Sequence, residues 1–402
     1  MLKKIRTEAL RPGMYVHDLD CGWLDHPFLR NRNRFAVTSE AQVRKVVAAG
    51  AREVCIDTAR GDDVNHAPTV DEARAALDRE MRAAALVAMT RRPVAAADET
   101  ARARRVMGEA TTIVRSVMSD VRLGHQVRVE AVGQVVEKMT GSILRNSGAL
   151  LSLARMKTKD DYTFMHSVSV GALLIAFCRD QGADATTIRN AGIGGMLHDI
   201  GKVRIADAVL HKPGRLTERE FATMKTHVDH SRRILARTPD IPALALDVAA
   251  QHHERHDGSG YPDGLAGDAI APIGQMAAIC DVYDAITSNR VYHKGLQPTE
   301  ALRKIFEWSR FHFNPELTQA FLRCIGIYPV GALVMLESGR LALVVDQQDG
   351  NLLQPRVRVV FNSRTDRYLP PEDLDLARPH CADRIVSHEA PERWRIDAAR
   401  FL

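Results

Sequence analysis

The sequence predicts a mainly α-helical protein with a small β-rich part at its N-terminal end and a small β appendage near its C-terminal end. Apolar residues recur at helical spacing through the middle of the chain, as Ile113, Val117 and Val121 do. Short β-prone runs bounded by turn residues lie toward both ends instead. With 402 residues, of which 45% are hydrophobic and 26% charged, the chain can bury a sizeable core and form two to three domains.

The N-terminal region, residues 1–65, is expected to be a β-rich regulatory domain. Runs such as Met14-Tyr15-Val16 and Val54-Cys55-Ile56 supply strands, and no catalytic group of residues occurs among them. Residues 66–98 are charged and alanine-rich, which predicts a linker that contains a helix. Residues 99–155 predict long amphipathic helices. Their apolar stripe suits a core, and it could also pair two protomers in a homodimer.

The most informative stretch is residues 251–262, QHHERHDGSGYP in one-letter code, within a helical catalytic region predicted at 156–326. Adjacent histidines on a helix point about 100° apart. Both can serve one site if they reach different metals, or if the helix ends between them. Gly258 and Gly260 permit backbone angles that other residues avoid, so the chain can turn sharply beside a ligand. Metal chemistry is therefore the first hypothesis.

Other candidate ligands lie upstream and downstream of this stretch. His198-Asp199 offers a nitrogen and a carboxylate, a combination that suits Fe, Mn, Zn or Ni better than Mg. His166 and Asp281 fall on apolar helical runs. His227 is expected on a helix that a capping box, Thr217 with Glu220, opens. Helices hold a site more rigidly than loops do.

In this order, these residues resemble the ligands of the HD phosphohydrolase superfamily, and residues 257–262 narrow the resemblance to the HD-GYP family. The resemblance covers roughly residues 155–325. It implies a helical, metal-dependent phosphodiesterase that hydrolyses cyclic di-GMP to pGpG, GMP or both, and so lowers this messenger in bacterial signal transduction. By the same resemblance, residues 1–65 are similar to the small uncharacterised domain that often precedes HD-GYP modules.

The resemblance also implies a role for each matching residue. Asp199 and Lys202 are implied to be catalytic, and Lys202 is implied to face the scissile phosphate. Further substrate contacts are implied at Arg290, His293, Lys294 and Tyr261, although the corner that contains Arg290 departs from the family pattern. The implied metal ligands are His166, His198, Asp199, His227, His252, His253 and Asp281.

Two metals are expected rather than three. Members with three metals carry a glutamate four residues before the histidine that matches His166, and this chain has Tyr162 there and Asp161 one place earlier. Iron or manganese is implied, and the same ligands accept Zn or Ni. Two cations about 3.5–4 Å apart lower the pKa of a bridging water. In a site of this kind, Asp199 would hold both metals, which would supply a hydroxide to attack phosphorus, and Lys202 would stabilise the developing charge.

Several residues near the motifs have two interpretations. Asp284 either orients a ligand or is a charge on a helix face. Glu254 either orients an imidazole or caps the turn that follows it. His211, His230 and His312 are expected on the surface.

Two other functions stay open. One is a slow or inactive cyclic di-GMP sensor that acts through protein contacts. The other is an HD phosphohydrolase for another nucleotide, against which the Gly-Tyr-Pro block speaks. The sequence leaves room for a diguanylate cyclase or another signalling protein as a partner.

The composition fits a soluble, cytoplasmic protein. The net charge of +5 suits an anionic ligand, and no aromatic residues accompany the basic runs as nucleic-acid binding would require. The six cysteines form no Cys-x-x-Cys pair, which fits a reducing compartment. Neither a signal peptide nor a membrane span is visible. Residues 327–378 predict the β appendage, and residues 379–402 a tail.

Overall fold

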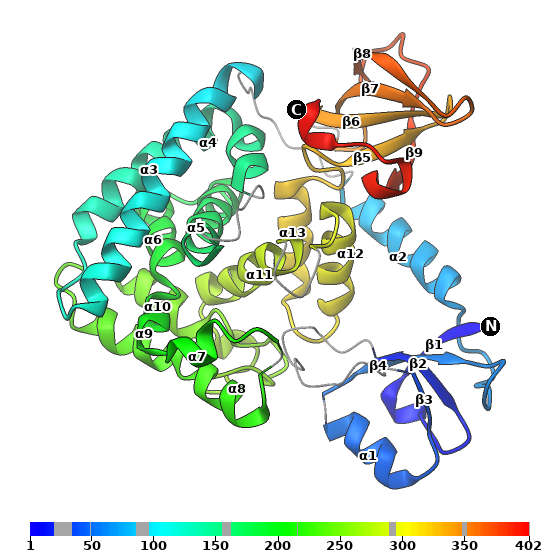
Figure 1. Cartoon of the computed structure of the whole chain (residues 1–402), viewed down its shortest axis with the longest axis horizontal. Coiled ribbons are helices and arrows are strands. Elements are labelled where there is room, and N and C mark those ends of the chain that lie inside the picture. Colours follow the sequence, from blue (N-terminus) through cyan, green and yellow to red (C-terminus); the bar gives the residue numbers. More distant parts are fainter. Residues whose placement is uncertain are drawn as a thin grey trace. The chain divides into compact units, whose positions relative to one another are not determined.

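The structure is a computed structural model that describes residues 1–19, 34–48, 50–85, 96–154, 162–214, 216–288, 295–347 and 352–401. The prediction of a mainly helical fold with small sheets toward both ends is confirmed (Figure 1). The chain divides into two compact units. One comprises Met1–Glu80 with His211–Ala222, and the other Met81–Leu210 with Thr223–Leu402. The boundaries between the six predicted segments stay predictions.

The N-terminal sheet has the strand order β1-β4-β2-β3 and is antiparallel throughout. Its core contains Val16, Val54 and Ile56, because alternate side chains of a strand point to the same face. The sequence did not single out the first strand or the helix. The elements are β1 (Leu2–Arg6), β2 (Tyr15–Leu19), β3 (Phe35–Ala36), α1 (Glu40–Ala48) and β4 (Glu53–Asp57).

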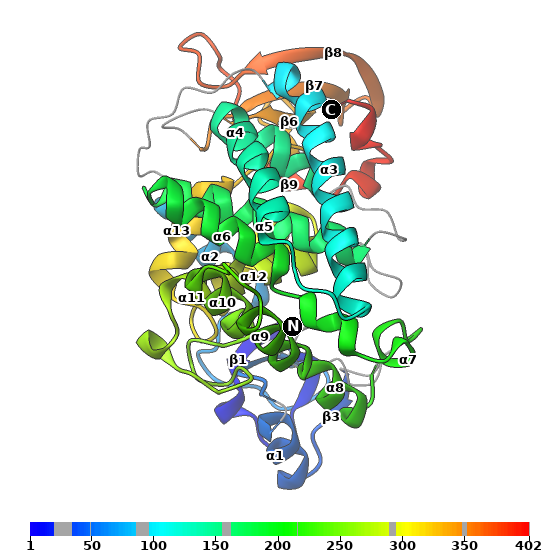
Figure 2. The ribbon, with the colours of Figure 1, turned by 90° about the vertical axis from the view of Figure 1, so that its left-hand side faces the viewer.

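Three helices follow this sheet along the chain: α2 (Val70–Ala85), α3 (Ala96–Arg122) and α4 (Val129–Ala154). The short connection between α3 and α4 lets them pack side by side (Figure 2). Helix α4 is kinked at Asn146, where φ is −156° and ψ is 105°. The side chain of Asn146 accepts a hydrogen bond from the N–H of Ala149 at 2.9 Å, so it caps the second half of the helix.

Most of the remaining helices form the core around the candidate site, whereas α7 and α8 contain no buried residues. Helices α5 and α11 are apolar nearly all round, as expected for helices inside a larger core. Helix α6 approaches α5 closely, because a Cβ atom on Gly195 would lie 2.7 Å from the Cα atom of Gly171. The elements are α5 (Tyr162–Asp180), α6 (Ala185–Leu197), α7 (Asp207–Leu210), α8 (Glu218–Lys225), α9 (His227–Ala236), α10 (Ala243–Gln251), α11 (Pro272–Thr287), α12 (Pro298–Trp308) and α13 (Pro315–Ile325).

The C-terminal sheet is antiparallel with the order β8-β7-β6-β5-β9. Part of the predicted tail belongs to it, since β9 pairs with β5, and Trp394 and Phe401 pack against its core. A turn at Ser338-Gly339 connects β5 and β6, and the φ of Gly339 is 80°. The strands are β5 (Leu333–Leu336), β6 (Arg340–Asp346), β7 (Arg356–Asn362), β8 (Arg367–Asp375) and β9 (Ile385–Glu389).

Within the described part of the chain, none of the helices is both long and apolar enough to cross a membrane.

Candidate metal centre

The structure brings the predicted metal-ligand residues together in one buried place. Three of them lie at helix ends: His198 is the C-cap of α6, His227 begins α9, and His252 is the C-cap of α10. The chain thus leaves α10 at the pair His252-His253, which lets neighbouring imidazoles reach the same centre. The full set, all buried, is His166, His198, Asp199, His227, His252, His253 and Asp281.

We call His166, His198 and Asp199 the first group. Each offers one ligand atom, and these atoms lie within 4.8 Å of one another. Asp199 Oδ2 is 3.2 Å from His198 Nε2 and 3.5 Å from His166 Nε2. Asp281 borders this group, with its Oδ1 atom 3.0 Å from His166 Nε2. Two imidazoles and two carboxylates therefore face a common centre.

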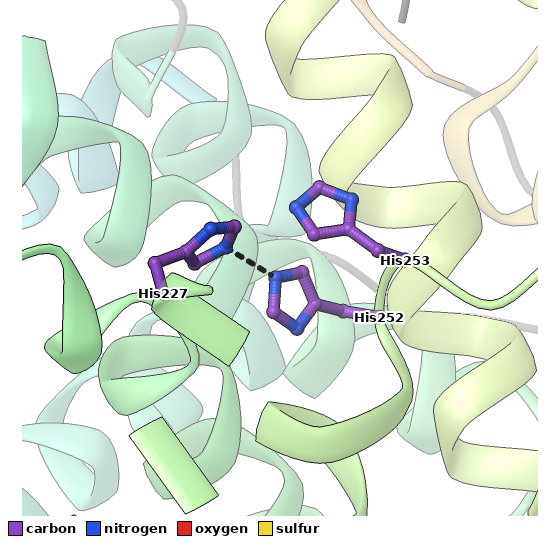
Figure 3. A group of neighbouring side chains, drawn as sticks. All are labelled: His227, His252 and His253. Atoms are coloured by element: carbon purple, nitrogen blue, oxygen red, sulfur yellow. Dashed lines mark hydrogen bonds between the residues drawn. The ribbon is translucent and has the colours of Figure 1, made fainter. Parts of the chain in front are cut away.

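The second group consists of His227, His252 and His253, whose rings gather around one point (Figure 3). His227 Nε2 and His252 Nε2 are 3.4 Å apart (Figure 3). A hydrogen bond between these two nitrogens requires a proton on one of them, whereas a cation can bind the lone pairs of both. The pair therefore suits a shared cation better than a shared proton. Three imidazoles in one place match a site for Fe, Mn, Zn or Ni.

Asp199 connects the two groups. Its Oδ2 atom faces His198 and His166, whereas its Oδ1 atom lies 3.2 Å from His227 Nε2 and 4.0 Å from His252 Nε2. One carboxylate therefore presents one oxygen to each group. A residue that bridges two cations requires this arrangement.

The turn that carries His198 and Asp199 is fixed against helix α9. Ser231 Oγ donates to His198 O at 2.8 Å and accepts from the N–H of Gly201 at 2.9 Å. A Cβ atom at position 201 would lie 2.0 Å from the backbone oxygen of His227, so only glycine permits this approach. The two groups are adjacent because these backbones touch.

Contacts outside the centre orient four of the imidazoles. Each uses its Nδ1 atom away from the centre, so its Nε2 atom points inward, as in sites where a second contact fixes the ring of a metal-binding histidine. Asp284 therefore holds a ligand rather than sitting as a charge on an exposed helix face. The contacts are His166 with Asp284 Oδ2 at 2.6 Å, His198 with Gly195 O at 2.7 Å, His227 with Met224 O at 2.7 Å and His252 with Ala249 O at 3.1 Å.

His253 is the exception. Its Nδ1 atom makes no hydrogen bond among the described residues and lies 3.8 Å from Asp281 Oδ2. Its ring stacks on Tyr261, with centroids 4.6 Å apart and an interplanar angle of 26°.

The charges of the site suit metal ligands. Burial raises the pKa of Asp199, but the positive charge of Lys202 and the interactions with His198 and His227 outweigh it and hold that pKa well below the usual value. Burial likewise raises the pKa of Asp281, and the hydrogen bond from His166 more than reverses this. Burial lowers the pKa of His253 well below its usual value. Ionised carboxylates and a neutral imidazole are the forms that bind cations.

Three buried atoms of the site test whether a cation fits. His198 Nε2, Asp199 Oδ1 and His253 Nδ1 have no hydrogen-bond partner among the described residues. Buried polar atoms are ordinarily satisfied, so such atoms call for a ligand. His198 Nε2 and Asp199 Oδ1 face other residues of the set, His253 Nδ1 lies 3.8 Å from Asp281 Oδ2, and all three are donor atoms of a type that transition metals accept. The residues present therefore fit a divalent metal site.

Lys202 lies at the edge of this centre, in the 3-10 turn Ile200–Arg204. Its ammonium donates to Asp199 Oδ2 at 2.5 Å, and its side chain is partly exposed. The prediction that it stands beside the place where an anion would bind is thus compatible with the geometry.

We call residues 254–265 the signature loop. Glu254 is buried, and its carboxylate accepts from the N–H of Asp263 at 2.8 Å and of Leu265 at 3.0 Å. The Glu254 carboxylate therefore stabilises the loop, and among the described residues it makes no hydrogen bond to an imidazole. Gly260 packs on the same segment, because a Cβ atom there would lie 2.4 Å from the backbone nitrogen of Arg255.

Two sequence-based expectations about histidines were wrong. His312 was expected on the surface, but its side chain is only 10% exposed, and its Nδ1 atom is 3.6 Å from Asp257 Oδ2 in the signature loop. Its backbone oxygen also accepts from the N–H of His256 at 2.9 Å. The capping box of Thr217 and Glu220 opens α8, but the chain turns at Thr226, so His227 begins a separate helix.

Some predicted residues cannot be placed. Arg290, His293, Lys294 and Asp161 lie outside the described residues, as does the side chain of Tyr162. The expected substrate contacts at the first three, and the expected lack of a third metal, stay predictions.

Comparison with known proteins shows to which family the chain belongs. Residues 146–317 match the sequence profile of the HD domain, and residues 2–132 match that of a domain of unknown function, DUF3391. A cyclic di-GMP phosphodiesterase of Pseudomonas aeruginosa is 43% identical over 394 residues, which is 98% of this chain and 94% of that protein. The chain belongs to the HD-GYP family. Membership implies that divalent metal binds at the His and Asp cluster.

Other HD-GYP relatives match over a shorter stretch. A cyclic di-GMP phosphodiesterase of Vibrio cholerae is 45% identical over 132 residues, 31% of this chain and 27% of that protein. A 3′3′-cGAMP-specific phosphodiesterase of the same organism is 40% identical over 141 residues, 35% of this chain and 26% of that protein. Similar identity thus accompanies different named substrates, so these partial matches do not by themselves select a substrate.

Proposed function

We propose that this HD-GYP protein is a metal-dependent phosphodiesterase that hydrolyses cyclic di-GMP. The relative that matches nearly the whole chain carries this activity in its name, and the match includes the N-terminal domain as well as the HD domain. The proposal rests on the geometry of Asp199, whose two carboxylate oxygens face two separate groups of imidazoles. Such a site suits an anionic phosphodiester.

The first and second groups, with Asp281, would hold two divalent transition metals, for which iron or manganese is our proposal and zinc or nickel fits the same donors. When bound, such a pair supplies Lewis-acid chemistry that activates water and neutralises phosphate charge. The residues supply the rest. Asp199 joins both positions, while Asp284 keeps the Nε2 atom of His166 directed inward.

Lys202 would act on the substrate itself. Its ammonium is next to the centre and its side chain is 22% exposed, so we expect it to reach a phosphoryl oxygen from its present turn. A fixed positive charge beside a phosphate stabilises charge that develops as the P–O bond breaks, most strongly where water is scarce. Hydrolysis adds one water across each P–O3′ bond, which gives pGpG and then GMP.

The test also includes 3′3′-cGAMP as a second candidate substrate, because the 40% identical relative of Vibrio cholerae is named for it. Steady-state rates with cyclic di-GMP and 3′3′-cGAMP, measured on the same metal-loaded protein, separate the two. We expect kcat/KM for cyclic di-GMP to be higher by about tenfold or more. The reverse order would assign the protein to the other dinucleotide. Tight binding without products would make it a sensor.

A further inference from the structure

We infer that Tyr261 positions the His253 imidazole, and that it is not a surface on which a base of the substrate stacks. The two rings are already stacked, with centroids 4.6 Å apart. The backbone N–H of Tyr261 also donates to His253 O at 3.1 Å. The signature loop therefore returns to the histidine next to which it begins, and it holds that histidine by both backbone and ring. This inference rests on the proposed metal site.

His253 needs such a support more than the other imidazoles do. The rings of His166 and His252, like those of their neighbours, are fixed by a bond at the Nδ1 atom that points away from the centre. In His253 the Nδ1 atom, 3.8 Å from Asp281 Oδ2, has no hydrogen-bond partner among the described residues. Packing must then set the angle of this ring. Tyr261 provides a flat surface at the right distance.

The surroundings of Tyr261 disfavour a role in base stacking. The Lys225 ammonium lies over the tyrosine ring, 5.5 Å from its centroid, within the range of a cation–π attraction. A nucleobase on the face that His253 covers would have to displace this imidazole and so disturb the second group, and it would also have to accommodate the Lys225 ammonium beside the ring.

The backbone of the signature loop keeps the tyrosine in place. Glu254 binds two N–H groups of the segment just after Tyr261, at Asp263 and Leu265. The absence of a side chain at Gly260 lets the loop pack directly on the backbone of Glu254. Contacts thus fix the chain both just before and just after Tyr261.

The test uses the full chain loaded with Co²⁺, whose visible absorption reports the ligands and geometry of each bound ion. We compare Tyr261→Leu and Tyr261→Phe with His253→Ala as the reference for a lost ligand. Tyr368→Leu, a change at a 54% exposed tyrosine on β8, is the matched control. Circular dichroism verifies that each variant is folded. Should Tyr261→Leu not fold, Tyr261→Met replaces it.

We expect Tyr261→Leu to weaken one Co²⁺ site by about 10–100-fold and to shift the spectrum toward that of His253→Ala. Tyr261→Phe should keep both the affinity and the spectrum, because a ring without the hydroxyl still stacks. Unchanged Co²⁺ binding in Tyr261→Leu together with a raised KM for cyclic di-GMP would overturn the inference in favour of a substrate contact. A Tyr261→Phe variant as damaged as Tyr261→Leu would also overturn it. Unchanged Co²⁺ binding in His253→Ala would instead refute the proposed metal site.

Discussion

The Nδ1 atom of His166 lies 2.6 Å from Oδ2 of Asp284, and both side chains are buried. The two residues are 118 positions apart in the chain and come from helices α5 and α11. Since one ring nitrogen is committed to the carboxylate, the other is left to face the centre. This contact makes Asp284 part of the site, although its carboxylate binds the ring nitrogen that faces away from the centre.

Replacing Asp284 should weaken metal binding without removing a ligand. We expect Asp284→Ala to lower metal affinity by about 10–100-fold, because His166 loses the partner that sets its orientation. A chelator competition measures this affinity. Asp71→Ala, at an exposed aspartate in the first turn of α2, is the control. Equal affinities in Asp284→Ala and the parent protein would mean that the contact is structural only.

Replacing Lys202 should separate catalysis from metal binding. Lys202→Ala should retain its metals and lose about 10²–10³ in kcat, because a fixed charge at the reacting phosphate is gone. Metal analysis and steady-state kinetics on the same sample provide both values, with Lys304→Ala on α12 as the control. An effect confined to metal content would show that Lys202 serves Asp199 and not the substrate.

Replacing Glu254 should loosen the signature loop. Its carboxylate accepts from two N–H groups, and a glutamine has one accepting oxygen in its place. We expect Glu254→Gln to lower the free energy of unfolding by about 1–3 kcal/mol, the cost of a buried donor left without an acceptor. Hydrogen exchange at the Asp263 and Leu265 amides should rise as well. Glu316→Gln, at an exposed helix start, should change neither, and protection kept in Glu254→Gln would refute the assignment.

The buried thiols should resist modification. Burial raises the pKa of Cys178 to about 12, and it raises that of Cys280 well above the ordinary value. At pH 8, only about one Cys178 in 10⁴ is then a thiolate, the reactive form, and this fraction grows as pH rises. Iodoacetamide should label the partly exposed Cys55 and Cys381 first, as peptide mass spectrometry would show. Rapid labelling of Cys178 in the folded protein would contradict its burial.

The set of metal-ligand residues could be predicted because most of its members belong to short sequence motifs. His198-Asp199 and His252-His253 are adjacent in the chain, and their order fits a known family. The apolar runs around His166 and Asp281 also form the predicted helices α5 and α11. The structure adds the geometry: which oxygen of Asp199 faces which group was not accessible from spacing alone.

Contacts between distant segments could not be predicted. His312 looked like an ordinary surface residue, because nothing near it in sequence indicates that it meets Asp257. The break at Thr226 was missed because the residues around it are compatible with a continuous helix. Strand β8 contains Pro370 and Pro371, which argue against a strand unless it lies at an edge, and β8 is an edge strand.

The most direct test of the account counts metals and products in the same samples. The protein and Asp199→Ala are purified anaerobically, their bound metals are measured, and cyclic di-GMP is added while products are separated by chromatography. The account predicts about two metals per chain and release of pGpG or GMP, with both lost in Asp199→Ala although helical content is retained. Unchanged turnover in Asp199→Ala, or tight binding of uncleaved cyclic di-GMP to the metal-loaded protein, would contradict it.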